Sequence, residues 1–171
     1  MECMRIAGIT YDSFVDGPGL RVVVFAQGCD LGCANCHNPS SWDTTAGDEY
    51  TVAQLVRKIK KPRPGRELVR GLTLSGGEPF MQAGELALVA KAVKKLGWDV
   101  TTYTGRTYEK LAACVDDAGI QALLEVTDYL IDGPYIEARR TLELKFRGSA
   151  NQRIIDMAAT RKKGEIVLYN M

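Results

Sequence analysis

Apolar and polar positions alternate along this chain in a pattern that predicts strands followed by helices. The run 20–27, "LRVVVFAQ", is rich in β-branched and aromatic residues and predicts a buried strand. Runs of the same kind predict further strands at 71–77, 98–105, 128–133 and 164–170. Apolar residues recurring at steps of three and four predict helices at 51–59, 83–97 and 107–119. Two stretches, 41–51 and 60–67, are instead rich in loop formers.

Local signals predict the ends and the inward faces of these helices. Thr51 is a candidate cap for the first helix, and Gly97 is a candidate stop for the second. In the third helix the residues expected to face inward are Tyr108, Leu111, Ala112 and Val115.

The repeated order of strand and helix predicts the fold class. It favours parallel pairing with right-handed crossovers. Roughly four such units are too few for a full eight-fold barrel. We therefore expect an α/β fold, a partial, open (βα)n barrel with a parallel sheet, formed by residues 1–171 as a single domain.

Candidate polar residues follow each of the first four predicted strands. Cys29 to Cys36 follow the first, Gly76 to Glu78 the second, Thr104 the third and Asp132 the fourth. Ligands gather at the carboxyl ends of parallel strands, so these four segments are expected to converge on one edge.

Charge and cysteine usage narrow the function classes. A net charge of +1 gives no electrostatic case for binding nucleic acid or an anionic membrane surface. The N-terminal segment holds no apolar run long enough for a signal peptide or a membrane span, and we expect a cytoplasmic protein. Thiols stay reduced there, and five is an odd number, so clustered cysteines indicate metal or redox chemistry before disulfides.

Three cysteines, Cys29, Cys33 and Cys36, are spaced C-x3-C-x2-C within a polar loop. A structural zinc site needs four protein ligands. His37 directly follows the third cysteine, and Cys3 and Cys114 remain as alternative fourth ligands, so a zinc site stays open as an alternative. A [4Fe–4S] cluster held by three thiolates keeps one iron free for another ligand, which fits this spacing without a fourth residue.

A second motif, "SGGEP" from Ser75 to Pro79, closes the second predicted strand. Gly76 and Gly77 let the backbone approach a ligand closely, and Glu78 adds a carboxylate that can hold an amino group. On its own this motif could be a plain turn between a strand and a helix.

Together the two motifs resemble the signature of radical S-adenosylmethionine enzymes. The resemblance implies that Cys29, Cys33 and Cys36 hold a [4Fe–4S] cluster whose open iron binds the methionine end of S-adenosyl-L-methionine. It implies reductive cleavage to a 5′-deoxyadenosyl radical, with no catalytic side chain beyond the cluster and cofactor. Its implied cofactor-binding residues are Asn35, Cys36, His37, Ser75, Gly76, Gly77, Glu78, Thr104 and Asp132. Two of these depart from a simple assignment: many radical enzymes have an aromatic residue where Asn35 stands, and Asp132 could equally cap the next turn.

The segment 11–43 is similar to the opening of glycyl-radical-enzyme activases, with the frame "DGPG.R…F.QGC…C..CHNP..W". The short chain and the tail 126–156, which contains "KFRGSANQR", resemble the activating proteins of the anaerobic (class III) ribonucleotide reductase. The implied partner is that reductase, whose glycine loses a hydrogen atom to the radical. Arg147 and Arg153 are then expected to contact its glycine loop. A flavodoxin or ferredoxin is the implied electron donor, and a homodimer is compatible with the resemblance.

Three alternatives remain open. The chain could activate another glycyl radical enzyme of the pyruvate formate-lyase type. It could be a small-molecule radical enzyme, although that group typically follows its last cysteine with Asp-Thr rather than with His37 and Asn38. The zinc alternative would make it an interaction module without catalytic activity.

Overall fold

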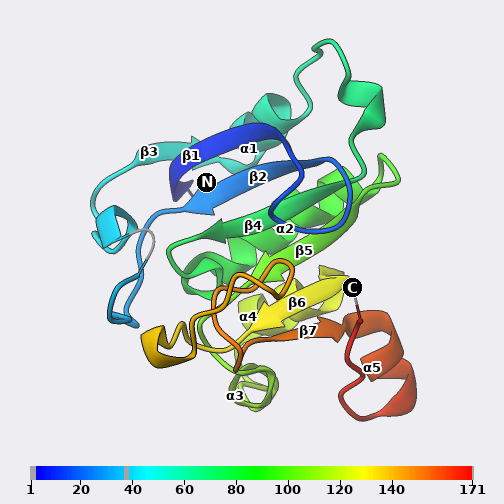
Figure 1. Ribbon diagram of the computed structural model, residues 1–171. Coiled ribbons are helices and arrows are strands. Elements are labelled where there is room, and N and C mark those ends of the chain that lie inside the picture. The colour runs from blue at the N-terminus through cyan, green and yellow to red at the C-terminus, as the bar shows by residue number, and fades with distance from the viewer. Residues whose placement is uncertain (1–2, 37–38, 171) are drawn as a thin grey trace.

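The computed structural model describes residues 3–36 and 39–170 and forms one seven-stranded sheet with helices packed on it (Figure 1). The strand order is β3-β1-β2-β4-β5-β6-β7. The strands are β1 (Cys3–Ser13), β2 (Arg21–Ala26), β3 (Asp48–Thr51), β4 (Gly71–Gly76), β5 (Asp99–Tyr103), β6 (Tyr129–Asp132) and β7 (Arg153–Asp156). The α-helices are α1 (Val52–Ile59), α2 (Ala83–Lys94), α3 (Tyr108–Ala112), α4 (Ala118–Val126) and α5 (Met157–Lys163).

The centre of the sheet is parallel and its margins are antiparallel. Strands β2, β4, β5 and β6 pair in parallel, whereas β1 and β3 on one side and β7 on the other pair antiparallel to their neighbours. In the described part of the chain β3 and β7 are not neighbours, so the sheet does not close. The predicted open, partial barrel is confirmed, with antiparallel margins that the repeat of strand and helix did not indicate.

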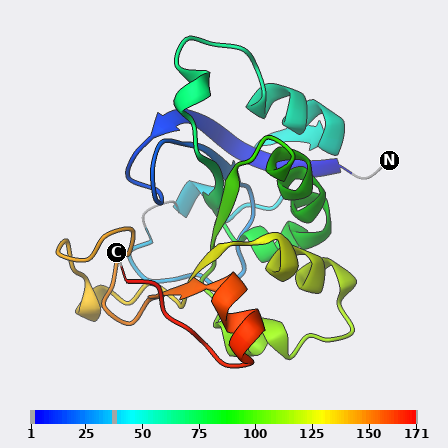
Figure 2. The same ribbon diagram turned by 90° about the vertical axis from the view of Figure 1, so that its right-hand side faces the viewer.

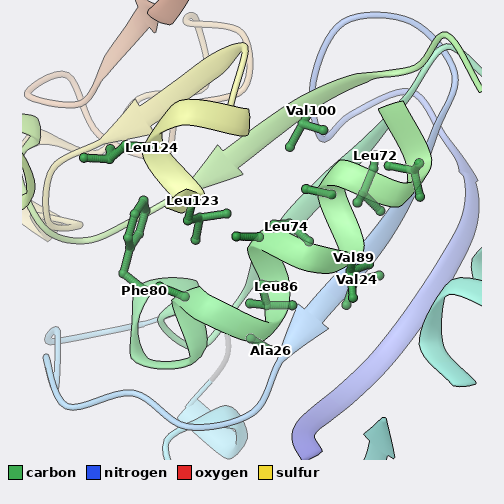
Figure 3. Packing of buried hydrophobic residues seen from close by; sticks show 14 of the residues in the cluster. Val24, Ala26, Leu72, Leu74, Phe80, Leu86, Val89, Val100, Leu123 and Leu124 are labelled. Carbon is green, nitrogen blue, oxygen red and sulfur yellow. The ribbon is translucent and has the colours of Figure 1, made fainter. Parts of the chain in front are cut away.

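The apolar core lies between the sheet and the helices α1, α2 and α4, which gather on one side of it (Figure 2). Alternate strand residues point toward these helices because successive side chains of a strand face opposite sides. Figure 3 shows this packing, with strand side chains such as Val24 and Leu74 opposite Leu86 and Leu123 of the helices. The predicted helix signals are confirmed at Thr51, which forms a capping box with Gln54, and along α2.

The side chains on the other side of the sheet are not part of this core. Phe25, Ser75 and Tyr103 come from β2, β4 and β5, and all three line a cavity there. The long connection between β6 and β7 lies over this side (Figure 2). None of the helices in residues 3–36 and 39–170 is long and apolar enough to span a membrane.

Three sequence predictions about elements are wrong. The helix expected at 107–119 ends at Ala112, and a separate helix, α4, begins at Ala118 behind the side-chain cap of Asp117. Val115 lies in the break, and its side chain is 72% exposed rather than facing inward. This happens because Asp117 accepts a hydrogen bond from the amide of Ile120 and so starts a new helix.

The strand expected at 164–170 is reduced to an isolated bridge between Ile155 and Leu168, since α5 occupies the residues before it and β7 provides the last strand. The loop-rich stretch 41–51 contains the short strand β3, which exists through pairing with β1. The pattern of residues 3–13 did not reveal β1 itself.

Candidate functional site

An open cavity of about 720 Å³ lies at the carboxyl ends of the parallel strands. Its wall contains residues from all four segments predicted to converge. These are Cys29, Cys33 and Cys36 after β2, Ser75, Gly76 and Gly77 at the end of β4, Thr104 and Gly105 after β5, and Gly133 after β6. A second hollow, between α1 and α2, is lined by none of the predicted site residues.

The segment that follows β2, residues 28–36 and 39–42, is called here the cysteine loop. The amide of Gly28 donates to the carbonyl of Ser41 at 2.5 Å and that of Cys29 to Trp42 at 3.3 Å, so the two ends of the loop meet. Cys29, Cys33 and Cys36 are each half-buried. The loop can turn this tightly because Gly28 and Gly32 adopt positive φ values of 105° and 56°.

Asn35 also has a positive φ, 56°, and its side chain is exposed. Asparagine tolerates this left-handed conformation far better than bulky residues do. The left-handed backbone at this position therefore favours asparagine over the aromatic residue that the resemblance led us to expect there. Asn35 is not among the residues that line the cavity, and its contact with the adenosyl group stays a prediction. His37, the other residue expected on that side, lies outside the described residues.

The three cysteines have the right chemistry to bind an iron–sulfur cluster, although their side chains are not already arranged as a metal site. Three thiols from one loop line one cavity, and thiolates are the ligands that iron–sulfur clusters use. Among residues 3–36 and 39–170, no three side chains of histidine, cysteine, aspartate or glutamate are already gathered as a metal-binding group. Burial raises the pKa of the Cys29 thiol, partly offset by the amide of Leu31. Cys3 and Cys114 are exposed, and neither lines the cavity.

The segment Ser75–Glu78, called here the glycine edge, is packed against the start of the cysteine loop. The amide of Gly77 donates to Ala26 and that of Glu78 donates to Gly28, both at 2.8 Å. A Cβ atom on Gly77 would lie 2.2 Å from the carbonyl oxygen of Gly28. On Gly76, where φ is 95°, it would lie 2.5 Å from the amide of Ala26. Any other residue at position 76 or 77 would therefore clash with the protein's own backbone, whether or not a ligand is bound.

The side chain of Glu78 is held inside the protein. The residue is 1% exposed, and its carboxylate accepts hydrogen bonds from the hydroxyl of Thr104 at 2.8 Å and the amide of Gly105 at 2.9 Å. The amide of Phe80 donates a third at 3.1 Å. Burial raises the pKa of Glu78, and these donors oppose that rise. Glu78 thus joins the end of β4 to the loop after β5, and its predicted hold on an amino group stays a prediction.

Asp132 is also engaged within the fold. It is 1% exposed, accepts a hydrogen bond from the amide of Tyr108 at 2.8 Å, and binds Arg153 through two contacts of 2.9 and 2.5 Å. Arg153 reaches Glu109 as well, at 2.6 Å. These contacts join Asp132 to Tyr108 and Arg153, which are 24 and 21 residues away, rather than to the turn that follows it, and its contact with the cofactor stays a prediction. Arg153 does not line the cavity, whereas Arg147 does.

Several residues of the cavity wall were not predicted. Among them are Val15, Trp42, Tyr103, Leu142, Leu144 and Phe146. An ion pair between Arg106 and Asp30 at 3.2 Å, also unpredicted, links the cysteine loop to the segment after β5. The alternation of apolar residues at 142, 144 and 146 is a signal that could have drawn attention to that stretch.

Comparisons with known proteins agree with one another. The family model of the 4Fe-4S single cluster domain matches residues 15–155. The anaerobic ribonucleoside-triphosphate reductase-activating protein of Vibrio cholerae is 37% identical over 143 residues, which cover 81% of this chain and 88% of that protein. The protein of the same name from Pasteurella multocida is 36% identical over 146 residues, with the same shares of the two chains.

Two further matches cover less. The pyruvate formate-lyase-activating enzyme of Clostridium pasteurianum is 38% identical over 117 residues, covering 66% of this chain but 49% of that enzyme. Among solved structures, QueE from Escherichia coli has a TM-score of 0.46 at 20% identity, covering 61% of this chain and 53% of that one. This last likeness is too low to carry a conclusion.

Proposed function

The chain belongs to the family of 4Fe-4S single cluster domains and to that of the anaerobic ribonucleoside-triphosphate reductase-activating proteins, and from this we propose that it activates such a reductase. The observation that carries the proposal is coverage. The match spans 88% of the reductase-activating protein of Vibrio cholerae but only 49% of the lyase-activating enzyme of Clostridium pasteurianum. The first match also covers 81% of this chain and the second 66%, so this chain shares more of its residues with the reductase-activating protein.

The cofactors follow from the family, and we assign them to the cavity. When bound there, a [4Fe–4S] cluster would supply one electron that breaks a carbon–sulfur bond of S-adenosyl-L-methionine, releasing methionine, and the deoxyadenosyl group set free would take a hydrogen atom from a glycine of the reductase. We propose that Cys29, Cys33 and Cys36 hold the cluster, because all three line the cavity. An electron donor of the flavodoxin or ferredoxin class is needed to supply that electron.

The part of the cavity wall next to the cysteine loop, formed by the end of β4, is proposed to bind S-adenosyl-L-methionine. Ser75, Gly76 and Gly77 bring the backbone of β4 to the surface of the cavity without covering it by large side chains. Glu78 and Asp132 are positioning residues in this proposal. Glu78 fixes Thr104 and Gly105, while Asp132 fixes the first turn of α3.

The openness of the site fits a protein substrate. Phe25, Trp42 and Tyr103 give the cavity an apolar wall that limits water at the reacting atoms. On the outside, the cavity is bordered by exposed residues of two loops, among them Val15 and Leu142, which are 76% and 89% exposed. A loop of a second protein can enter such a mouth, whereas a small molecule is normally enclosed on most sides.

The test is to reconstitute the protein without oxygen, reduce it, and add S-adenosyl-L-methionine together with either an anaerobic ribonucleotide reductase or a pyruvate formate-lyase. Electron paramagnetic resonance is expected to show a glycyl doublet on the reductase and none on the lyase. A reductase whose radical-forming glycine is replaced by alanine is the control and gives no doublet. A doublet on the lyase alone would contradict the proposed partner, and a protein that binds zinc in place of iron and sulfide would contradict the proposed chemistry.

A further inference from the structure

The connection between β6 and β7 contains a stretch with the sequence pattern of a strand. In Leu142–Arg147, called here the loop tip, Leu142, Leu144 and Phe146 alternate with Glu143, Lys145 and Arg147. Alternation with a period of two is typical of a strand with one apolar face. The loop tip nevertheless belongs to none of the seven strands of the described chain.

The apolar face of the loop tip is turned to the cavity. Leu142, Leu144 and Phe146 all line it, as does Arg147, whereas Glu143 and Lys145 do not. Leu142 is 89% exposed and Leu144 37% exposed. Exposed apolar side chains that border a cavity mark a surface on which another apolar group binds.

The base of the loop tip is held firmly. Arg140 and Ser149 form an antiparallel bridge, and the amide of Thr141 donates to the carbonyl of Gly148 at 3.1 Å. On the cavity side, the hydroxyl of Tyr103 donates to the carbonyl of Phe146 at 2.8 Å. Phe146 itself has a φ of 64°, a conformation that is costly for an aromatic residue and persists only where its surroundings impose it.

Some backbone amides of the loop tip are available to donate hydrogen bonds to a ligand. In the described part of the chain, the amides of Leu142 and Leu144 donate to no backbone carbonyl, and the amide of Glu143 donates to the hydroxyl of Thr141. Residues 139–147 also carry four cationic side chains against one carboxylate. An extended segment with apolar side chains and nearby carboxylates would complement both features.

We propose that the loop tip, whose backbone forms bends and a turn, binds an apolar and acidic segment of the protein substrate through its side chains and free amides, beside the mouth of the cavity. The inference rests on the proposed function, because it takes the occupant to be the protein whose glycine enters the cavity. Leu142, Leu144 and Phe146 contact apolar residues of that segment, and the amides of Leu142 and Leu144 donate hydrogen bonds to its carbonyl groups. The cationic side chains around them favour segments that carry Asp or Glu.

The experiment uses the reconstituted full chain and a fluorescein-labelled peptide of about 15 residues that spans the radical-forming glycine of the reductase. Leu142→Asp is expected to weaken binding of this peptide, measured by fluorescence anisotropy, by about tenfold or more, because one exposed leucine loses its apolar contact. Leu88→Asp is the matched control, since Leu88 is 54% exposed on α2, which packs on the other side of the sheet. Thermal unfolding of both variants verifies that they fold.

Hydrogen exchange gives a second readout that concerns the backbone. The amides of the loop tip are expected to exchange more slowly when the peptide is bound, because the peptide covers them and accepts hydrogen bonds from them. Unchanged exchange in the loop tip, or equal peptide affinity for Leu142→Asp and the original protein, would overturn the inference. So would a Leu142→Asp variant that separates a dimer of this chain while its peptide affinity is unchanged.

The two levels of the proposal fail differently. If the original protein forms a glycyl radical on the reductase but its loop tip does not respond to the peptide, only the inference about the loop tip is wrong. If the original protein neither binds the peptide nor forms the radical, the proposed function is wrong and the inference is wrong with it.

Discussion

The cysteine loop and the glycine edge form neighbouring parts of one cavity wall, and they are built differently. The glycine edge is fixed by the fold, with Glu78 1% exposed and bound by three donors, and with Gly77 pressed against Gly28. The cysteine loop is joined at its two ends, and its three cysteines are only half-buried. The described thiols line the cavity without already forming a metal-binding group.

The difference indicates which part of the site depends on its ligand. A wall made of strand ends and buried hydrogen bonds gains its shape from folding alone. A loop of half-buried thiols gains order when metal binds, because binding free energy then replaces missing packing. We therefore expect substitutions in the glycine edge to lower the stability of the protein itself, and those in the cysteine loop to remove the cluster while leaving the fold.

The largest effect is expected from the cysteines. Replacing Cys29, Cys33 or Cys36 with alanine should abolish the cluster in anaerobically reconstituted protein, because in the proposed site each supplies one of three thiolates. Bound iron, acid-labile sulfide and visible absorption measure this. The thermal unfolding of the metal-free protein should change little. Cys3→Ala and Cys114→Ala are the controls, and loss of the cluster in either would show that the ligand set is wrong.

Gly77→Ala is expected to be the most destabilising change in the glycine edge. Its new Cβ would lie 2.2 Å from the carbonyl oxygen of Gly28, so the strand end or the cysteine loop must shift. We expect a loss of roughly 3 kcal/mol in the free energy of unfolding of the metal-free protein, measured with urea. Gly84→Ala is the control, because its nearest neighbour would be 3.8 Å away. Equal stability of the two variants would contradict the close packing of this edge.

Glu78→Gln tests the buried carboxylate. The NH2 group of glutamine would face a backbone amide that now donates to the carboxylate, either that of Phe80 or that of Gly105. An unpaired buried donor costs about 1–3 kcal/mol of unfolding free energy. The exposed Glu125→Gln on α4 provides the comparison and should stay within about 0.5 kcal/mol of the original protein. A neutral effect at position 78 would mean that its carboxylate does not organise the strand ends.

The smallest effect is expected from Thr104→Val. It removes one donor to Glu78 and one acceptor of the Arg106 amide without changing the size of the side chain. The free energy of unfolding should fall by about 1 kcal/mol in the same urea titration. Thr104→Ser keeps the hydroxyl, so it should be less affected. If the serine variant loses more stability than the valine variant, packing of the methyl group outweighs the hydrogen bonds.

The same contrast explains how far the sequence could predict this molecule. The parallel centre of the sheet was predictable because strands such as 20–27 are continuous apolar runs, which fully buried strands require. The convergence of four strand ends followed from that topology. By contrast, β3 exists only through its pairing with β1, and the break between α3 and α4 depends on the cap at Asp117.

Within the site, motif spacing indicated the cysteines and the two glycines but not what the neighbouring side chains contact. Glu78 looked available for a ligand because its partners, Thr104 and Gly105, are more than twenty residues away in the chain. Asp132 and Arg153 form a similar long-range pair. Such contacts depend on tertiary packing, so only the structure could separate residues that line the cavity from those that support it.

The measurement that tests this account most directly is hydrogen exchange of the protein with and without its reconstituted cluster. We predict that amides in residues 28–36 and 39–42 exchange quickly in the metal-free protein and slow markedly once iron and sulfide are bound. Amides of the segment 74–80 should exchange slowly in both states. Equal protection of both segments in the metal-free protein, or a cluster that leaves the cysteine loop unprotected, would contradict the account.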